Sequence, residues 1–377
     1  MRRYWASLLA LALLPGAGGC RRRRAPVFEG YAFVAAAGGS SVAVVDLATF
    51  SLERQIRLPS RPSQVVADPE RQLVYVMGEG GPAGLAILDA ASRQLRRTQW
   101  VADKPRRLRL SPDGRSLYVL DGGTHSLRVV ETPGGRHLRE IRLPATPVDF
   151  DVSPDGRRAG VSLVSDQLSI VDLERARVLA TVKVGRQAGP VAVRFDGRQA
   201  FVANRADHSL SVVELAEGRL LAHLPLGTRP EALRFKPDGG ELFVSGGDAG
   251  VVMIISAYRD EVDRPLLAGS EPRDMAVSHD NRLLYVANSA ANTVSVIHID
   301  QRRTLAAVTV GEEPHRVAVT TDNNYALVLN RRSGDMAVLR RRVLEGREGV
   351  TLFTLVPVGV QPVDLVVMAR EPAAGSS

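Results

Sequence analysis

The chain alternates short apolar runs with polar turn signals at a regular spacing. Between residues 271 and 311, four apolar runs of four to six residues are separated by turns such as Ser278-His279-Asp280-Asn281. The runs alternate or are rich in β-branched residues, and none reaches helix length, so the pattern predicts four antiparallel strands. Copies of this stretch, each about 42 residues long, fill nearly the whole chain. Such a repeat is typical of a β-propeller blade.

A proline opens the expected first strand of each repeat, a place where the missing N–H is tolerated. About six residues later comes a turn built from Asp, Pro, Gly or Asn, as in Ser111-Pro112-Asp113-Gly114. These prolines set the alignment of the repeats, and there are eight of them: Pro62, Pro105, Pro147, Pro190, Pro230, Pro272, Pro314 and Pro362.

The two ends of the repeat region complement each other. Residues 31–37, 41–47 and 52–58 predict three strands, and the usual first strand of that repeat is missing. Residues 361–368 (QPVDLVVM) predict a lone first strand at the other end. We therefore expect the C-terminal strand to complete the blade that the N-terminus begins, because ring closure removes exposed sheet edges.

Several motifs resemble a known repeat family. The runs SPDGRSLYV (residues 111–119), FVAN (201–204), YVAN (285–288) and VSVI (294–297) are similar to YVTN-type β-propeller repeats, and the resemblance spans residues 31–369. It implies an all-β propeller, and the usual ring of that family has seven blades. The eight prolines predict eight four-stranded blades here, with seven as the alternative and an irregular last blade carrying a polar insertion at 340–349.

Eight-bladed rings also resemble the haem-binding domain of cytochrome cd1-type nitrite reductases and a related lipoprotein needed to make that haem. This second likeness rests on blade count and repeat style, because no ligand motif matches.

The N-terminus has the pattern of an export signal. Residues 1–20 carry Arg2 and Arg3, an apolar run at 5–14 and a small-residue stretch before Cys20, the one cysteine of the chain. The site resembles a bacterial lipobox, although Ala17 stands where leucine is usual. The resemblance implies a lipid on Cys20 and attachment to the envelope, at the outer membrane or cell surface. We expect a basic linker at 21–30 and a disordered tail at 370–377.

The charge of the chain narrows the range of partners. The formal net charge is +8, and the arginines are spread over all repeats, which indicates a soluble surface rather than a nucleic-acid site. Residues 21–24 are four arginines that oppose translocation, so they form either a tether to anionic headgroups or a solvated linker. With one cysteine, no intrachain disulfide can form. We also expect the protein to be a monomer.

The first strands should line a central channel, and their charged residues are the candidate site. Counted from each proline, the second residues are Gln64, Arg107, Asp149, Ala192, Ala232, Asp274, Arg316 and Asp364, and the fourth are Val66, Arg109, Asp151, Arg194, Arg234, Ala276, Ala318 and Val366. Five arginines and four aspartates would then face the channel. They form either a funnel that binds carboxylate or phosphate or a ring of salt bridges that neutralises itself.

No residue pattern points to a particular reaction. His315 follows a rim proline and is the one histidine expected at the channel mouth, but no metal-ligand spacing or C-x-x-C-H motif is present, so we expect no metal and no cofactor. We therefore expect a non-enzymatic binding or scaffold lipoprotein that recognises a protein, peptide or polymer through its face loops. The alternative is a periplasmic cofactor-handling protein or enzyme, acting on a haem d1-type tetrapyrrole or on a lactone at the channel mouth.

Overall fold

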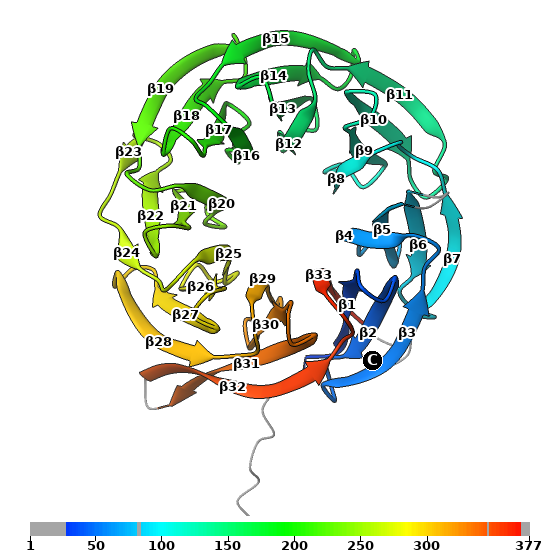
Figure 1. Ribbon diagram of the computed structural model, residues 1–377, viewed down its shortest axis with the longest axis vertical. Coiled ribbons are helices and arrows are strands. Elements are labelled where there is room, and N and C mark those ends of the chain that lie inside the picture. Colours follow the sequence, from blue (N-terminus) through cyan, green and yellow to red (C-terminus); the bar gives the residue numbers. More distant parts are fainter. Residues whose placement is uncertain (1–27, 81–83, 345–346, 371–377) are drawn as a thin grey trace, which may run out of the picture.

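The computed structural model describes residues 28–80, 84–344 and 347–370, and these form a ring of eight antiparallel sheets (Figure 1). We number the blades from the one that holds the N-terminal strand. Blade 1 is β33 (Pro362–Ala369), β1 (Gly30–Ala36), β2 (Ser41–Asp46) and β3 (Ser51–Arg57); blade 2 is β4 (Arg61–Asp68), β5 (Leu73–Glu79), β6 (Leu85–Asp89) and β7 (Gln94–Gln99); blade 3 is β8 (Pro105–Leu110), β9 (Ser116–Asp121), β10 (Ser126–Glu131) and β11 (His137–Arg142).

The other five blades follow in chain order. Blade 4 is β12 (Pro147–Val152), β13 (Arg158–Leu163), β14 (Gln167–Asp172) and β15 (Arg177–Lys183); blade 5 is β16 (Ala188–Val193), β17 (Gln199–Asn204), β18 (Ser209–Glu214) and β19 (Arg219–Pro225); blade 6 is β20 (Pro230–Phe235), β21 (Glu241–Gly246), β22 (Val251–Ser256) and the short β23 (Glu261–Val262) and β24 (Leu266–Leu267); blade 7 is β25 (Pro272–Val277), β26 (Leu283–Asn288), β27 (Thr293–His298) and β28 (Arg303–Thr309); blade 8 is β29 (Pro314–Val319), β30 (Tyr325–Asn330), β31 (Asp335–Leu344) and β32 (Arg347–Pro357).

The ring closes through the strand pair that the sequence predicts. β33 pairs antiparallel with β1, with Tyr31 opposite Met368 and Val34 opposite Leu365. The predictions of eight blades and of a first blade completed by the C-terminal strand are confirmed, and the alternative of seven is wrong. The expected signal peptide, Cys20, most of the 21–30 linker and residues 371–377 lie outside the described residues.

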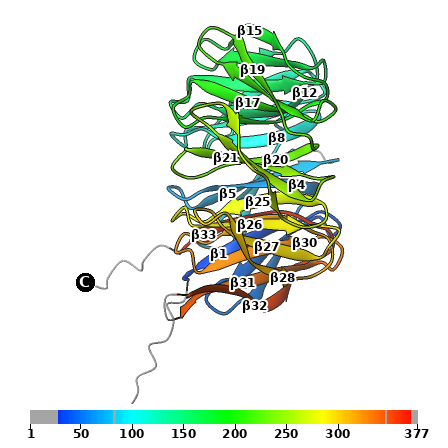
Figure 2. The same cartoon turned by 90° about the vertical axis from the view of Figure 1, so that its left-hand side faces the viewer.

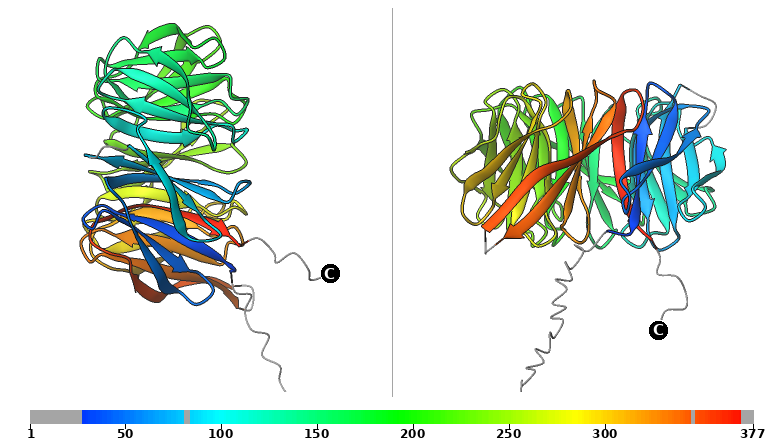
Figure 3. Two further views of the ribbon diagram at one scale, coloured as in Figure 1. Left: turned by 90° about the vertical axis from the view of Figure 1, so that its right-hand side faces the viewer. Right: turned by 90° about the horizontal axis from the view of Figure 1, so that it is seen from below.

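Two faces of the ring differ in the loops that form them. We call the face formed by the loops before the first strands and the turns between second and third strands the rim face. The turns after the first and third strands form the opposite, turn face. First strands run from rim face to turn face (Figure 2). The described chain starts and ends at the turn face in blade 1, where Gly30 pairs with Ala369 (Figure 3).

The core lies between the blades. Inward residues of neighbouring sheets form eight apolar clusters, each shared by two adjacent blades, as where Phe33 of blade 1 packs with Val76 of blade 2. Phe33, Phe150, Phe201 and Phe243 are fully buried there. Burying one such side chain contributes about 1.5–3 kcal/mol, so each blade depends on its neighbours for stability.

The recurrent Ser-Pro-Asp-Gly motif builds a turn. The Ser111 hydroxyl donates to Asp113 Oδ1 at 2.6 Å and accepts from the Ser116 backbone N–H at 2.9 Å. Gly114 follows with a φ of +66°, which favours glycine. The hydrogen bond from Ser111 is the largest effect on the Asp113 carboxyl and holds its pKa below the usual range. The motif therefore has a local structural purpose.

The asparagine that ends several second strands is also structural. Asn204 donates through Nδ2 to the hydroxyls of Ser209 and Ser211, at 3.0 and 2.9 Å, and its Oδ1 accepts from the Gly185 backbone N–H at 3.1 Å. It is fully buried. A Cβ at Gly185 would lie 2.6 Å from this side chain, so a glycine is needed there. The asparagine thus fastens the loop that enters its own blade.

One part of the proline alignment is wrong. In blades 6 and 7 the proline pairs with the last residue of the second strand, as in Pro230–Gly246 and Pro272–Asn288. In blade 5 that place is taken by Ala188, which pairs with Asn204, and Pro190 lies two residues further along β16. Every later position of this strand is therefore displaced by two residues toward the turn face.

Blades 6 and 8 depart from the regular four-stranded pattern. The polar insertion at 340–349 extends the β31–β32 hairpin, and Arg341 there pairs with Glu348 and, at 2.7 Å, with Asp280 of blade 7. In blade 6 the outer strand is split, so that β23 and β24 pair with different parts of β22. Within the described part of the chain, no helix is long and apolar enough to cross a membrane.

Removing the closing strand tests the dependence of each blade on its neighbours. A chain that stops after Gln361 loses β33 and leaves β1 with an unpaired edge, so we expect its free energy of unfolding to fall by at least about 5 kcal/mol. Thermal unfolding and size-exclusion chromatography measure the loss and the expected aggregation. A control chain that stops after Arg370 keeps every described strand and should unfold like the full chain.

Candidate ligand-binding channel

A cavity of about 640 Å³ follows the axis of the ring. All eight first strands contribute to its wall, from Gln64 of blade 2 to Asp364 of blade 1. Arg273 and His315 line its rim side, and Pro237 and His279 line its side near the turn face. The cavity therefore meets both faces, and its wall is a mixture of charged and apolar side chains.

In four of the eight blades, the side chain at the second position bonds to the backbone of the next first strand. Asp274 Oδ2 accepts from the Val317 backbone N–H at 3.2 Å, and Asp364 Oδ2 accepts from the Val65 N–H at 3.0 Å. Asp149 Oδ2 receives a longer bond of 3.4 Å from Val191 N–H. Gln64 makes the same link with both amide atoms, accepting from the N–H and donating to the C=O of Leu108, at 2.9 and 3.0 Å. First strands do not pair as a sheet, so these bonds satisfy their free backbone groups.

Each of these aspartates also meets an arginine of a neighbouring blade. Arg107 Nε lies 3.0 Å from Asp149 Oδ1, and Arg316 lies 3.4 Å from Asp274 and 2.7 Å from Asp364. Asp274 receives a second arginine, because Arg234 Nη2 lies 2.7 Å from its other oxygen. The three aspartates are almost fully buried, and their arginines are about a third to a half exposed.

The arginines keep donors that these ion pairs do not use. Among the described residues, Arg107 makes ion pairs or hydrogen bonds only through Nε. Arg109 and Arg316 each have one terminal nitrogen, Nη2, without a hydrogen-bond or ion-pair partner there. Asp274 favours the charged form of Arg234, but burial and repulsion from Arg316 and Arg109 outweigh it, so the pKa of Arg234 lies below its usual value. For Arg316, attraction to Asp364 comes first and raises the pKa. Three arginines from different blades thus act on one another in this channel.

Arg194 lies apart from the other candidates. Displaced with its strand, it reaches the turn face, where it donates to Asp196 at 3.0 and 2.8 Å and to the Ala257 carbonyl at 2.7 Å. It occupies the place that Ser111 has in blade 3, next to an aspartate two residues on. Asp151 is not part of the cavity wall, but it pairs with Arg109 at 3.3 Å and accepts from Val193 N–H at 2.8 Å. The channel therefore holds four of the five predicted arginines.

His315 lines the cavity without presenting a ready ligand atom. Its Nδ1 is buried with no hydrogen-bond partner among the described residues, and its Nε2 lies 3.4 Å from the Val363 carbonyl oxygen. Burial is the main reason that its pKa falls below the usual value, so the imidazole is neutral at pH 7. No group of three or more His, Cys, Asp or Glu residues forms a metal-binding cluster in the described ranges.

Glu231 and Arg273 also line the channel, and the sequence analysis missed both. They directly follow the rim prolines, and strict alternation would point them away from the second-position residues. A register shift after the proline, as between Pro272 and Asp274, places a bulge there, so that neighbouring residues reach the same space. The sequence feature that could have indicated this bulge is the proline at the start of each first strand, because β-bulges are frequent at strand ends and beside functional sites.

Comparison with known proteins supports the fold and leaves the family open. Residues 270–353, which cover blade 7 and most of blade 8, match the family described as lactonase, 7-bladed beta-propeller. This is a minor part of the chain, and the ring here has eight blades. The comparison with curated proteins finds no match.

Three solved structures share the architecture. Dihydro-heme d1 dehydrogenase NirN in complex with DHE aligns with a TM-score of 0.71 and 17% identity over 92% of this chain and 76% of its own. Hydrazine synthase of Kuenenia stuttgartiensis aligns at 0.60 and 19%, over 75% and 96%. A functionally unknown protein from Desulfotomaculum acetoxidans aligns at 0.57 and 13%, over 91% and 100%. At these identities the likeness concerns the fold alone.

Asp274 is the charge on which two arginines converge, so its neutralisation should be costly. In Asp274→Asn, Arg234 and Arg316 lose their shared partner, and we expect the free energy of unfolding to fall by about 2–3 kcal/mol, because solvent partly screens both guanidinium groups. Urea unfolding followed by circular dichroism measures the change. The control Asp300→Asn removes a carboxylate that is 69% exposed and 3.9 Å from Lys236, and it should cost less than about 0.5 kcal/mol. Equal losses of unfolding free energy in the two variants would contradict the inference that Asp274 compensates the charges of both Arg234 and Arg316.

Proposed function

We propose that the protein is a non-enzymatic binding protein of the bacterial envelope, attached through a lipid on Cys20, that takes an anionic group of a protein, peptide or polymer at its central channel. The observation that carries the proposal is the convergence of Arg107, Arg109, Arg234 and Arg316 on one cavity, with guanidinium donors left outside their ion pairs. Guanidinium groups recognise carboxylate and phosphate with paired hydrogen bonds. A rigid ring holds these groups in place before the ligand arrives.

The balance of charge refines which ligand fits. The channel arginines are offset by Asp149, Asp151, Asp274 and Asp364, so an anion gains little from the long-range field of the cavity. Each aspartate, however, has its oxygens directed to backbone N–H groups and arginines of the wall. An anion would therefore bind through short-range hydrogen bonds. This favours a ligand with several carboxylates over a single small ion.

Arg234 offers the sharpest test, because its removal leaves Asp274 paired with Arg316. Nη1 and Nη2 of Arg234 each donate once, to the Leu233 carbonyl at 3.0 Å and to Asp274 at 2.7 Å, so each keeps a second N–H for a ligand. We expect Arg234→Gln to weaken the binding of a hexaglutamate peptide about tenfold, since one charge-assisted hydrogen bond is lost. Isothermal titration calorimetry on the soluble ring measures the dissociation constant. In the control Arg198→Gln, an arginine that is 80% exposed on the turn face is changed, and affinity should stay within twofold. Equal affinity of the wild type and Arg234→Gln would refute binding at this place.

A second candidate function is the handling of a tetrapyrrole, as in the alternative from the sequence. It is supported by the similar fold of dihydro-heme d1 dehydrogenase NirN, which was solved in complex with DHE, and by the channel arginines, which suit the carboxylates of such a ring. The histidine at the mouth does not fit iron ligation, because Nδ1 of His315 is buried and Nε2 faces the Val363 carbonyl. In this version the arginines would hold the ligand by its carboxylates.

Absorption spectroscopy separates the two candidates. If the channel takes a tetrapyrrole by its carboxylates, added haemin should shift its main visible band, Arg234→Gln should weaken the haemin affinity about tenfold, and His315→Ala should leave the bound spectrum unchanged. A spectrum that changes with His315→Ala would contradict the carboxylate-only mode. The absence of any shift, together with hexaglutamate binding, would leave the first candidate alone.

A further inference from the structure

Two aromatic residues break the repeat on the turn face of blades 5 and 6. Phe195 stands in the turn after β16, where blades 3, 4 and 6 have Pro112, Pro154 and Pro237. Tyr258 stands in the turn after β22, where the equivalent turns carry small or polar residues: Ala48, Ala91, Glu174, Ala216 and Asp300. Because the other blades form the same turns without Phe, Tyr or Trp at either of these two positions, the fold does not require aromatic side chains there.

The two aromatic residues contact each other and remain exposed. Their ring centroids lie 6.1 Å apart in an edge-to-face arrangement. The exposed fractions are 48% for Phe195 and 60% for Tyr258. A Cβ at Gly239, where φ is +75°, would collide with the Phe195 ring, so that turn leaves room for it. We call Phe195 and Tyr258 the aromatic pair.

Arg194 holds the aromatic pair in place. Its guanidinium carbon lies 5.6 Å from the Tyr258 ring centre, and its Nη1 donates at 2.7 Å to the carbonyl of Ala257, next to Tyr258. Asp196 accepts from its other nitrogens, as described above. Only 7% of Arg194 is exposed, so it is a support beneath the pair rather than a contact for a partner. The pair is therefore pre-organised at the surface.

Exposed cations flank the aromatic pair. The side chains of Arg198 and Arg259 are 80% and 74% exposed, and their acidic neighbours Asp196 and Glu261 lie at 4.0 and 3.3 Å. Surface pairs of this kind are weak and exchange readily with other anions. Aromatic rings beside basic side chains match the boundary between lipid headgroups and acyl chains, where rings sit at headgroup level and arginine meets phosphate.

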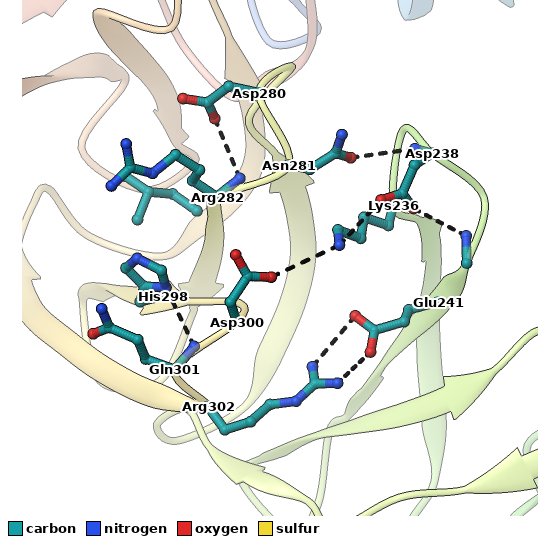
Figure 4. A network of polar contacts seen from close by, with 12 residues as sticks. Lys236, Asp238, Glu241, Asp280, Asn281, Arg282, His298, Asp300, Gln301 and Arg302 are labelled. Atoms are coloured by element: carbon teal, nitrogen blue, oxygen red, sulfur yellow. Dashed lines mark hydrogen bonds and ion pairs between the residues drawn. The ribbon is translucent and has the colours of Figure 1, made fainter.

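The neighbouring junction on the same face shows how this region differs. Between blades 6 and 7, polar contacts occupy the turns (Figure 4): Arg302 pairs with Glu241, Lys236 lies 3.1 Å from Asp238 and 3.9 Å from Asp300, and Asn281 accepts from the Asp238 N–H at 3.2 Å. These side chains satisfy one another. The junction between blades 5 and 6 instead presents apolar rings to the surroundings.

The place of the aromatic pair in the ring identifies its partner. The described chain begins at Phe28 and leaves the turn face in blade 1, and blade 5 lies across the ring from blade 1 (Figure 1). From Cys20 to Phe28 there are eight residues, which span at most about 28 Å. A lipid on Cys20 would thus hold the turn face close to the membrane at one side, and the aromatic pair would face it at the other.

We propose that Phe195 and Tyr258 are a second membrane contact, which inserts into a phospholipid surface and lays the ring flat on it with the turn face down. The proposal rests on the lipid attachment stated under the proposed function. Two attachment points across the ring fix its tilt, which a single tether does not. The rim face, with Arg273 and His315 at the channel mouth, then points away from the membrane toward ligands.

Flotation with vesicles of phosphatidylethanolamine and phosphatidylglycerol tests the contact without the anchor. The chain is produced from Ala25 onward, which keeps all described residues of the closed ring and removes both the lipid site and Arg21–Arg24. We expect the double variant Phe195→Ser, Tyr258→Ser to lower the vesicle partition coefficient at least about tenfold, because two apolar rings no longer insert. The matched control Leu267→Ser, Val360→Ser removes apolar side chains that are 79% and 65% exposed away from the turn face, and it should change partition less than twofold.

A fluorescent label reports the orientation, since this chain contains no cysteine. A polarity-sensitive dye on Ala216→Cys, at an exposed turn of blade 5, should shift to shorter wavelength with vesicles, and the same dye on Val360→Cys at the rim face should not. Absence of partition by the unchanged chain, equal partition of the double variant, or equal dye shifts at both positions would each overturn the proposal. Palmitate incorporation at Cys20 of the full chain is measured separately, so a failed anchor is distinguished from a failed contact.

Discussion

The ring depends on one interaction, the bond from a side chain of one first strand to the backbone of the next, which the second-position side chains of four of the eight blades make. First strands of adjacent blades belong to different sheets and do not pair with each other, so N–H groups such as those of Val65 and Val317 would otherwise be buried without partners. Asp149, Asp274, Asp364 and Gln64 supply the acceptors. Apolar clusters between blades provide most of the burial, but these bonds determine how the strands meet around the cavity.

The same interaction determines the chemistry of the channel. A buried aspartate that accepts from a backbone N–H still carries a full charge, and burying that charge is costly unless a cation lies near. Arginines from neighbouring blades provide it, as Arg316 does for both Asp274 and Asp364. A guanidinium group has more donors than one carboxylate can use. The need to close the ring therefore leaves spare, oriented donors around the axis.

The repeat allowed the fold to be predicted in detail, while the site was predicted only in part. Strand count, blade count and closure follow from spacing, because each blade must bury its faces against similar neighbours. The channel wall depends on register, which a two-residue displacement in blade 5 changes: Ala188 takes the place assigned to Pro190, and Arg194 leaves the channel. Spacing between prolines could not reveal this, since proline is tolerated at more than one place near a strand end. Glu231 and Arg273 were missed because a bulge interrupts the alternation.

Departures from the repeat are more informative about function than the repeated motifs. The Ser-Pro-Asp-Gly turns and the strand-ending asparagines are polar and recurrent, yet their hydrogen bonds all serve the fold. Blade 5 departs from the repeat both at the channel wall and at the turn face. Its displaced strand brings Pro190 and Val191, without charge, to the channel, and the same displacement places Arg194 and Phe195 at the turn face beside Tyr258. One local change in register thus takes Arg194 out of the channel and builds an exposed aromatic surface across the ring from the ends of the described chain. A repeat protein can acquire a second contact surface in this way without altering the blades that hold the first.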